Sequence, residues 1–295
     1  MWYRSYLNHS NNTSAEAVNV GITIVSNAII LDTAQQQPQI ASCANSYLLY
    51  DNLLNQGGVV YTSSQAEAAD SAGTLALSDG NTNIKFKASA GGNITIDCEM
   101  PLAKPINSMA VAGANLGSAL VTWRFYVWDA DLASYVLKSE GSGKKNNSPI
   151  FNAFDAIISN KVRFEFATTS AIEIGELGVG VALRFPVPAS VGYQPGRWST
   201  NDETFNGRTE SNAFSSSTII ARGATEQVEF AKLQDTWLDE NWINVIEKSN
   251  GRPVWFGQDM LLNPNKVIFG NMTVPKPKYD SAFRSSLQIK IDGVV

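Results

Sequence analysis

The sequence of 295 residues contains one histidine and only two cysteines. Zinc sites normally draw four ligands from histidine, cysteine and carboxylate side chains, and His9, Cys43 and Cys98 cannot supply the usual set. Any Ser-His-Asp or Cys-His site would have to recruit His9 from a polar N-terminal stretch. We therefore expect no metal, no cofactor and no histidine-dependent catalysis. Because Cys98 lies in an apolar strand and Cys43 in a loop-like region, two reduced cysteines are expected rather than a bridge.

Charge is also scarce. Charged residues make up 17% of the chain, and uncharged polar residues (serine, threonine, asparagine and glutamine) are used instead. The net charge is -5. Broad binding to a nucleic-acid backbone needs a concentrated positive surface, so nucleic acid is excluded as a partner. Polar surfaces with few charges are common where a protein meets other proteins or carbohydrate. A hydrophobic fraction of 44% predicts a folded chain.

Long apolar runs are absent from the sequence. No stretch approaches eighteen apolar residues, so we expect no membrane span. The first fourteen residues have no apolar segment of the kind found in secretion signals. These features predict a protein that is made in the cytoplasm.

The clearest pattern in the chain is an alternation of apolar and polar residues over residues 121–128. It places one apolar set on a single face of an extended strand, namely Val121, Trp123, Phe125 and Val127. A period of two is typical of a half-buried strand. The turn at residues 113–117 precedes this strand. Two large rings on the inward face predict a thick, sandwich-like core.

Other segments extend this picture to a mainly β fold. Alternating runs recur at residues 83–88, 94–97 and 162–166, and the glycines of residues 172–185 indicate bulges or close backbone approach. Asp235–Ser249 has apolar residues at helical spacing and ends before Gly251. We therefore predict an N-terminal arm over 1–19, a jelly-roll β-sandwich over 20–188, a linker over 189–212 and a smaller α+β domain over 213–295.

Few residues suggest chemistry. Asp97 and Glu99, or Glu173 and Glu176, would have to face each other across a cleft to cleave a glycosidic bond, and scattered surface acids are the commoner case. The pair Asp129 and Asp131 resembles the start of a calcium loop, but a β-turn is the stronger interpretation. We therefore predict a non-enzyme.

Candidate contact residues lie in two polar segments. In the predicted linker, Trp198 is the ring most expected to be exposed, together with Tyr193 and Arg197, and such a group can contact a partner or stack on a sugar. In the predicted exposed loop over residues 141–149, Lys144 and Lys145 form a short basic spot that we expect to be solvated.

Several short motifs resemble structural proteins of tailed bacteriophages, particularly tail and baseplate components. These motifs are Asn52-Leu53-Leu54, Val59-Val60-Tyr61, the segment Met109–Val127, the run Glu173–Gly180, and the strands at residues 253–256, 267–270 and 287–291. The resemblance covers most of residues 45–295 and none of the first forty. It implies a virion assembly protein whose first domain is a galactose-binding-like sandwich that binds glycan or neighbouring subunits.

The leading hypothesis is therefore a structural subunit of a phage particle, located in the virion and made in the host cytoplasm. Its partners would be other tail or baseplate subunits, and repetition of the chain would build a homo-oligomer. The first alternative is a carbohydrate-binding module that recognises host surface glycan. The second alternative is a glycan-degrading enzyme.

Overall fold

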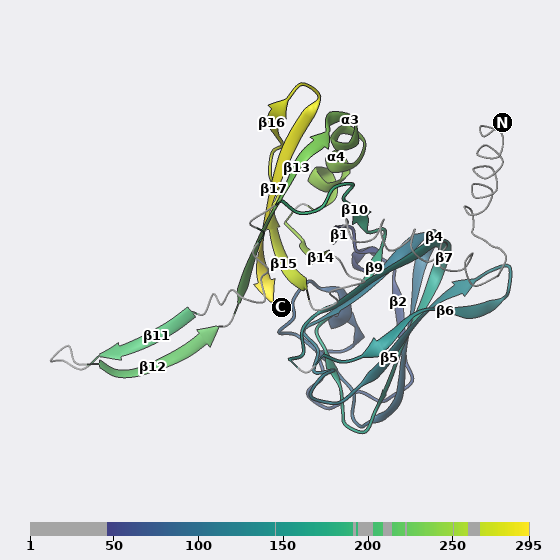
Figure 1. The fold of residues 1–295 in the computed structure, drawn as a ribbon. Coiled ribbons are helices and arrows are strands. Elements are labelled where there is room, and N and C mark those ends of the chain that lie inside the picture. Colours follow the sequence, from purple (N-terminus) through teal and green to yellow (C-terminus); the bar gives the residue numbers. More distant parts are fainter. Residues whose placement is uncertain are drawn as a thin grey trace, which may run out of the picture. The chain divides into compact units, whose positions relative to one another are not determined.

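Antiparallel β-sheets dominate the computed structural model (Figure 1). The structure describes residues 46–144, 146–190, 193, 203–208, 214–221, 223–249, 251–258 and 266–294; for 203–208, 214–221 and 294 it describes the backbone only. Predictions that fall on residues 1–45, including those for His9 and Cys43, lie outside this part of the chain. The prediction of a mainly β fold is confirmed.

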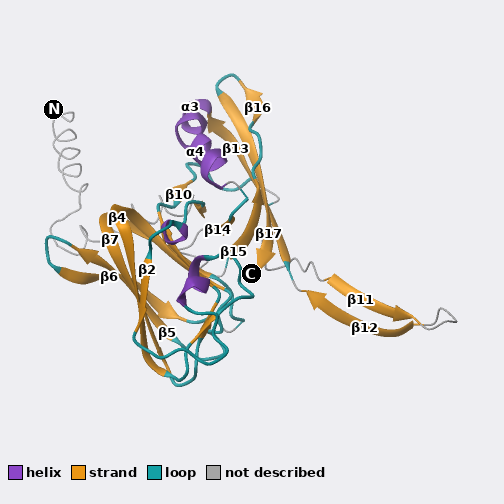
Figure 2. Ribbon diagram, turned by 180° about the vertical axis from the view of Figure 1, so that it is seen from behind, coloured by secondary structure: helices purple, strands orange, loops and turns teal. Residues whose placement is uncertain are grey.

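The first sheet has six strands in the order β2-β4-β7-β5-β6, with β9 paired to the other end of β4. Its strands are β2 (Val60–Ser63), β4 (Gly92–Ala112), β5 (Thr122–Asp129), β6 (Ser134–Ser142), β7 (Ile150–Thr168) and β9 (Glu176–Gly180). Figure 2 shows the long strands of this sheet curling. The inward face is closed by β3 (Phe86–Lys87), β8 (Glu173–Ile174) and two short 3-10 turns, η1 (Leu53–Asn55) and η2 (Thr74–Ser78).

The second sheet has seven strands in the order β10-β1-β14-β15-β17-β13, with β16 on β17. Its strands are β1 (Ser46–Leu49), β10 (Leu183–Arg184), β13 (Ala224–Gln234), β14 (Pro253–Gln258), β15 (Val267–Thr273), β16 (Lys278–Ser281) and β17 (Arg284–Val294). β1 and β10 come from the range expected to form the sandwich, yet they pair in this second sheet. The residues from Ser46 to Val295, which include both sheets, form one compact unit.

A helical segment packs on the second sheet, as the periodicity predicted. It runs through α3 (Asp235–Trp237), a π-helical stretch η4 (Leu238–Trp242) and α4 (Ile243–Ser249). Leu238, Trp242 and Val245 are buried in the second core. Ile246, which the helical spacing also placed on the inner face, is instead 48% exposed. The π-helical stretch is one reason, because an extra residue in a turn rotates everything that follows it.

The strand at residues 121–128 forms as predicted and is β5. Trp123 and Phe125 are buried in the first core, while Arg124 projects from the solvent face and pairs with Glu140 and Glu165. Phe125 lies against the Phe164 ring with a centroid separation of 4.8 Å. The large inward rings therefore do fill the core that the alternation predicted.

Three segments differ from the prediction. Residues 150–158, where no strand was predicted, belong to strand β7. The expected linker contains strand β11 (Glu203–Arg208), which pairs with β12 (Phe214–Ala221). At the start of that linker, Ser190 donates its backbone N–H to the Glu229 carbonyl at the edge of β13. In the expected linker, polar composition concealed the pairings, because backbone hydrogen bonds do not depend on apolar side chains.

The glycines of the run at residues 175–180 permit close packing, as predicted. A Cβ atom at Gly175 would lie 2.8 Å from Thr82 Cα, and one at Gly180 would lie 2.5 Å from the Asp51 carbonyl oxygen. A Cβ at Gly178 would meet the Trp255 ring at 3.0 Å. These positions let β9 lie against neighbouring backbone where no side chain fits.

We expect Gly180→Ala to lower the free energy of unfolding by roughly 1–3 kcal/mol, because its methyl group would overlap the Asp51 backbone. Gly57→Ala is the matched control, since a Cβ there would have no neighbour within 4 Å. Urea unfolding of both variants measures the effect. Equal midpoints for the two variants would contradict the packing described for β9.

Candidate functional site

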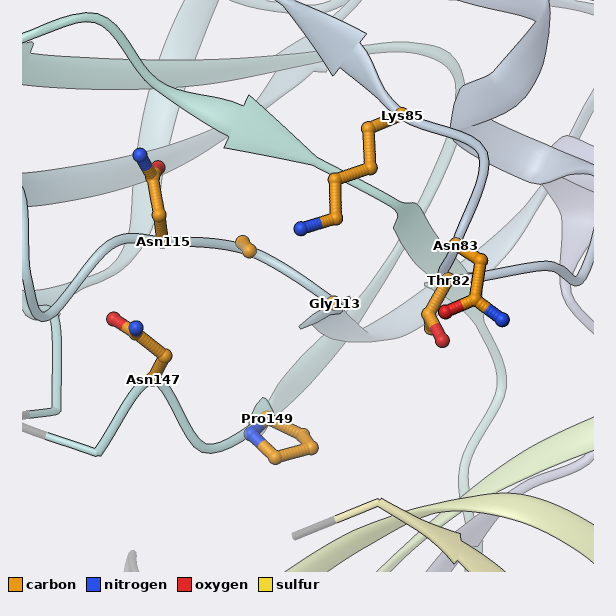
Figure 3. A pocket seen from close by; sticks show the side chains of 8 residues that line it. Thr82, Asn83, Lys85, Gly113, Asn115, Asn147 and Pro149 are labelled. Carbon is orange, nitrogen blue, oxygen red and sulfur yellow. The ribbon is translucent and has the colours of Figure 1, made fainter. Parts of the chain in front are cut away.

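A pocket of about 290 Å³ lies at the end of the first sheet where three turns meet (Figure 3). It is lined by Thr82, Asn83, Lys85, Gly113, Ala114, Asn115, Asn147 and Pro149. We call it the amide pocket because three of its lining residues carry side-chain amides. None of the described residues that line it carries a carboxylate or an aromatic ring.

The register of the first sheet creates two of the pocket's walls. Val111 of β4 is paired with Ile150 of β7, so the chain leaving β4 and the chain entering β7 lie side by side. These continuations are residues 113–115 and 147–149. Asn147 fastens the second wall to the sandwich, because its Oδ1 accepts the backbone N–H groups of Gly117 and Ser118, both at 2.9 Å.

Thr82 provides the third wall and is wedged between two glycines. A Cβ at Gly113 would lie 2.6 Å from Thr82 Cβ. Gly113 also has a φ of 64°, a conformation that favours glycine. A Cβ at Gly175 would lie 2.8 Å from Thr82 Cα, so the residue after β4 and the residue before β9 both adjoin the turn that carries Thr82.

A buried carboxyl group holds the same turn. Glu176 is 1% exposed, and its Oε2 accepts the Gly80 backbone N–H at 2.8 Å. Its Oε1 accepts from Asn52 Nδ2 at 3.3 Å. Burial, and secondarily the nearby Asp79 carboxylate, raise the pKa of Glu176 to about 8, against the hydrogen bonds from Gly80 and Asn52 that lower it. Glu176 is therefore mostly protonated at neutral pH.

Asn52 connects this carboxyl group to the neighbouring strand and turn. Its Nδ2 also donates to the Leu177 carbonyl at 2.8 Å, and its Oδ1 accepts the N–H groups of Leu54 and Val179, each at 3.1 Å. A buried amide with partners on both its atoms fixes β9 against η1. The sequence predicted Asn52 only as part of a motif and Glu176 only as a scattered acid. The one signal for Glu176 was an acid inside an otherwise apolar, glycine-containing run.

The polar groups of the amide pocket are mainly hydrogen-bond donors toward a ligand. The Asn115 Oδ1 is occupied by the Glu173 backbone N–H at 2.8 Å, and the Asn147 Oδ1 by the two bonds described above. Each side-chain amide has two N–H donors. The Asn115 amide uses one of them on the Ala171 carbonyl, and the Asn147 amide uses one on Ser118 Oγ. Lys85 Nζ lies 3.1 Å from Glu173 Oε2 and keeps two further N–H donors.

Tyr193 and Lys144, the two predicted contact residues that the structure describes, do not line the amide pocket. Tyr193 is half-buried beside the second core, and its hydroxyl donates to Glu226. The prediction that Lys144 is solvated is wrong. Its Nζ donates to the Pro149 carbonyl at 2.8 Å, and burial lowers the pKa of this amino group to about 8. Arg197, Trp198 and Lys145 lie outside the described residues.

The loop that carries Lys144 was expected to be exposed over residues 141–149. Instead it docks on the sandwich, and a Cβ at Gly117 would overlap the Lys144 carbonyl oxygen. Lys144 therefore stabilises the wall of the amide pocket that contains Pro149. A string of polar residues gave no indication of this, because the docking depends on backbone groups and the absence of a Cβ.

The candidate acids elsewhere have structural roles. Asp97 makes two hydrogen bonds to the Arg163 guanidinium, at 2.6 and 2.8 Å, and Glu99 pairs with Lys161 at 3.1 Å. Asp129 Oδ1 accepts the Asp131 backbone N–H at 2.9 Å, so this segment is a turn as predicted. Among the described residues, no group of three or more His, Cys, Asp or Glu side chains is placed to hold a metal ion.

Two further observations concern the cysteine and membrane predictions. Cys98 is a buried, free cysteine, and burial raises the pKa of its thiol. Within the described part of the chain, no helix is long and apolar enough to cross a membrane.

No protein-family model and no curated protein matches the sequence. Similar solved structures include the module CpGH89CBM32-5 from Clostridium perfringens, in complex with GalNAc-β-1,3-galactose, at 18% identity and a TM-score of 0.38 over 43% of this chain and 99% of that one. The family 32 carbohydrate-binding module of C. perfringens NanJ, in complex with galactose, matches at 15% identity and a TM-score of 0.37 over 45% and 98%.

A Ruminococcus gnavus fucosidase in complex with fucose matches at 14% identity and a TM-score of 0.40 over 54% of this chain and 31% of that one. Nothing in the comparisons indicates a phage particle, so the virion assignment stays a prediction.

We expect the change Glu176→Gln to remove the part of the pH dependence of the unfolding free energy that comes from the Glu176 carboxyl group. The folded pKa of about 8 lies above the ordinary value of 4.5, so the neutral carboxyl stabilises the fold fully below pH 4.5 and this contribution is lost as pH rises to 8. Glutamine stays neutral and keeps an acceptor for Gly80. The variant should therefore gain on the order of a few kcal/mol over the wild type between pH 5 and pH 8.5.

Urea unfolding at a series of pH values measures this difference. Glu99→Gln is the control, because its side chain is 53% exposed and pairs with Lys161 at the surface. A stability difference between Glu176→Gln and the wild type that stays constant with pH would show that Glu176 is not a buried neutral acid.

Proposed function

We propose that the sandwich of this chain binds a carbohydrate in the amide pocket. The observation that supports the proposal is the convergence of Thr82, Asn83, Lys85 and the amides of Asn115 and Asn147 from three turns on one hollow. After their internal bonds, these residues present N–H and O–H groups to a ligand. Sugar hydroxyl oxygens accept such hydrogen bonds, and side-chain amides and hydroxyls commonly determine ligand orientation in pockets.

The size and charge of the pocket restrict the ligand further. A volume of about 290 Å³ is at the small end of ligand pockets, which span roughly 300–1,000 Å³, and suits a single sugar unit at a chain end. Among the described residues that line the pocket, Lys85 alone is charged, and Glu173 balances it. A neutral sugar therefore fits better than a strongly anionic one.

We propose binding without cleavage. Glycoside hydrolysis normally uses two carboxyl groups that flank the scissile bond. The pocket lining includes no carboxylate in the part of the chain that the structure describes, Glu173 is occupied by Lys85, and Glu176 is buried behind the wall it supports. Incubation of the purified protein with host polysaccharide should release no reducing sugar, and measurable release would favour the enzyme alternative.

We expect Asn83→Ala to weaken sugar binding roughly three- to tenfold, because it removes one hydrogen-bonding side chain from the pocket. Asn83 is exposed and makes no side-chain hydrogen bond among the described residues, so the fold should be unaffected. Titration calorimetry with galactose and with GalNAc-β-1,3-galactose provides the measurement, followed by a glycan array. Asn93→Ala, at an exposed position of β4, is the matched control.

Trp198→Ala tests the competing site in the same assay. Loss of binding with Asn83→Ala and not with Trp198→Ala supports the amide pocket. The reverse result would place glycan contact at the predicted group of Tyr193, Arg197 and Trp198. Absence of binding by the wild type to every glycan on the array would overturn the proposal.

A second candidate function is assembly, as a subunit of a phage tail or baseplate. It is favoured by the β11–β12 hairpin, which pairs with no other strand in the part of the chain that the structure describes. An isolated two-stranded hairpin is marginally stable in water, so a partner subunit would stabilise it. Location of the chain in purified particles by electron microscopy supports this function, and a monomer with no particle association contradicts it.

A further inference from the structure

Strands β16 and β17 form a hairpin at one end of the second sheet (Figure 1). Two exposed aromatic residues lie at this end, Tyr279 in β16 and Phe283 in the turn. Tyr279 is 79% exposed and Phe283 is 82% exposed, whereas most large apolar side chains of this sheet are buried. Every residue from Lys276 to Arg284 is exposed. We call residues 276–284 the aromatic tip. Two rings held in water at one tip indicate an interaction surface.

The backbone conformation of Phe283 strengthens this indication. Its φ of 62° lies in the left-handed region, which glycine adopts readily and a bulky side chain adopts at a cost. A glycine would therefore be the favoured residue for stability at this position. Backbone strain retained at an exposed aromatic residue is a reason to infer function.

The aromatic tip is held in place by the neighbouring strand and helix. The Asp235 N–H, at the start of α3, donates to the Phe283 carbonyl at 3.4 Å, and Arg284 Nη1 donates to the Lys232 carbonyl at 3.1 Å. Below the turn, Ser285 Oγ donates to Asp235 Oδ1 at 2.7 Å. The rings are thus presented on a fixed backbone, which reduces the entropy lost on binding.

The charge of the aromatic tip is opposite to that of the whole chain. Residues 276–284 contain three cations, Lys276, Lys278 and Arg284, and one acid, Asp280, within a chain of net charge -5. Asp280 Oδ2 accepts the Lys232 backbone N–H at 3.4 Å, so the one acid is turned toward β13. No ion pair among the described residues involves Lys276 or Lys278.

We propose that the aromatic tip docks on an anionic lipid surface, with Phe283 and Tyr279 entering the headgroup region and the lysines facing the phosphates. Aromatic rings favour the membrane–water interface, and each lysine near an anionic surface adds about fivefold to the partition coefficient. A protein partner fits less well, because stable interfaces bury about 800 Å² on each side and a hairpin turn offers much less. This docking is independent of the sugar site.

The test is flotation of the full chain with vesicles of phosphatidylcholine, with and without phosphatidylglycerol. The wild type should bind the anionic vesicles at least about tenfold more strongly than the neutral ones, and added salt should weaken the binding. Phe283→Gly should lose most of the binding while its melting temperature stays equal or rises, because the strained φ is relieved. A double change of Lys276→Gln and Lys278→Gln should lower binding to the anionic vesicles alone.

Leu120→Gly is the matched control, because Leu120 is also 82% exposed with a left-handed φ of 52° but lies in the first sheet's turn region. It should bind vesicles as the wild type does. Failure of the wild type to bind anionic vesicles, retention of binding by Phe283→Gly, or an equal loss with Leu120→Gly would each overturn the proposal.

Discussion

The pairing of β4 with β7 is the constraint on which the rest of the first sheet depends. It extends from Gly92↔Thr168 to Val111↔Ile150 and brings many inward-facing side chains of the first core together. Because the pairing ends at Val111 and Ile150, the two chains continue together into the turns that form the amide pocket. β9 pairs with the same end of β4 through Ala112↔Glu176, which places Glu176 and Gly175 behind the third wall. The position of the site thus follows from strand register.

Burial of Glu176 and Asn52 adds polar specificity to this apolar framework. A buried acid lowers stability unless it is neutral or hydrogen-bonded, and Glu176 is both near neutral pH. The same carboxyl group that is unfavourable when charged fixes the turn bearing Thr82 and Asn83. Glu176 therefore supports the pocket without lining it.

The sequence predicted the elements whose side chains follow a period and missed those governed by backbone contacts. β5 and the helical segment at 235–249 were recognised because burial of one face leaves an alternating or helical pattern. Only residues 94–97 of β4 were predicted as an alternating run, because a register shift between Glu99 and Lys104 interrupts the pairing further along the strand. The start of β7 was missed because its residues 152–158 are largely half-exposed, so apolar and polar residues do not sort by face.

The site itself was beyond sequence reasoning. Its lining residues come from three turns that are distant in the chain, and asparagine, threonine and glycine are ordinary turn residues at each of them. Tyr193 and Lys144 were chosen for exposure, yet both make buried or half-buried structural contacts. Glycine was the most informative residue type, since Gly113, Gly175 and Gly117 mark the close approaches that shape the pocket.

The central claim is that a sugar occupies the amide pocket, and mapping of backbone amide chemical shifts during titration with GalNAc-β-1,3-galactose tests it most directly. The account predicts that saturable changes concentrate at residues 82–85, 113–115 and 147–148. Changes centred on any other surface, or no changes at saturating sugar, would contradict it.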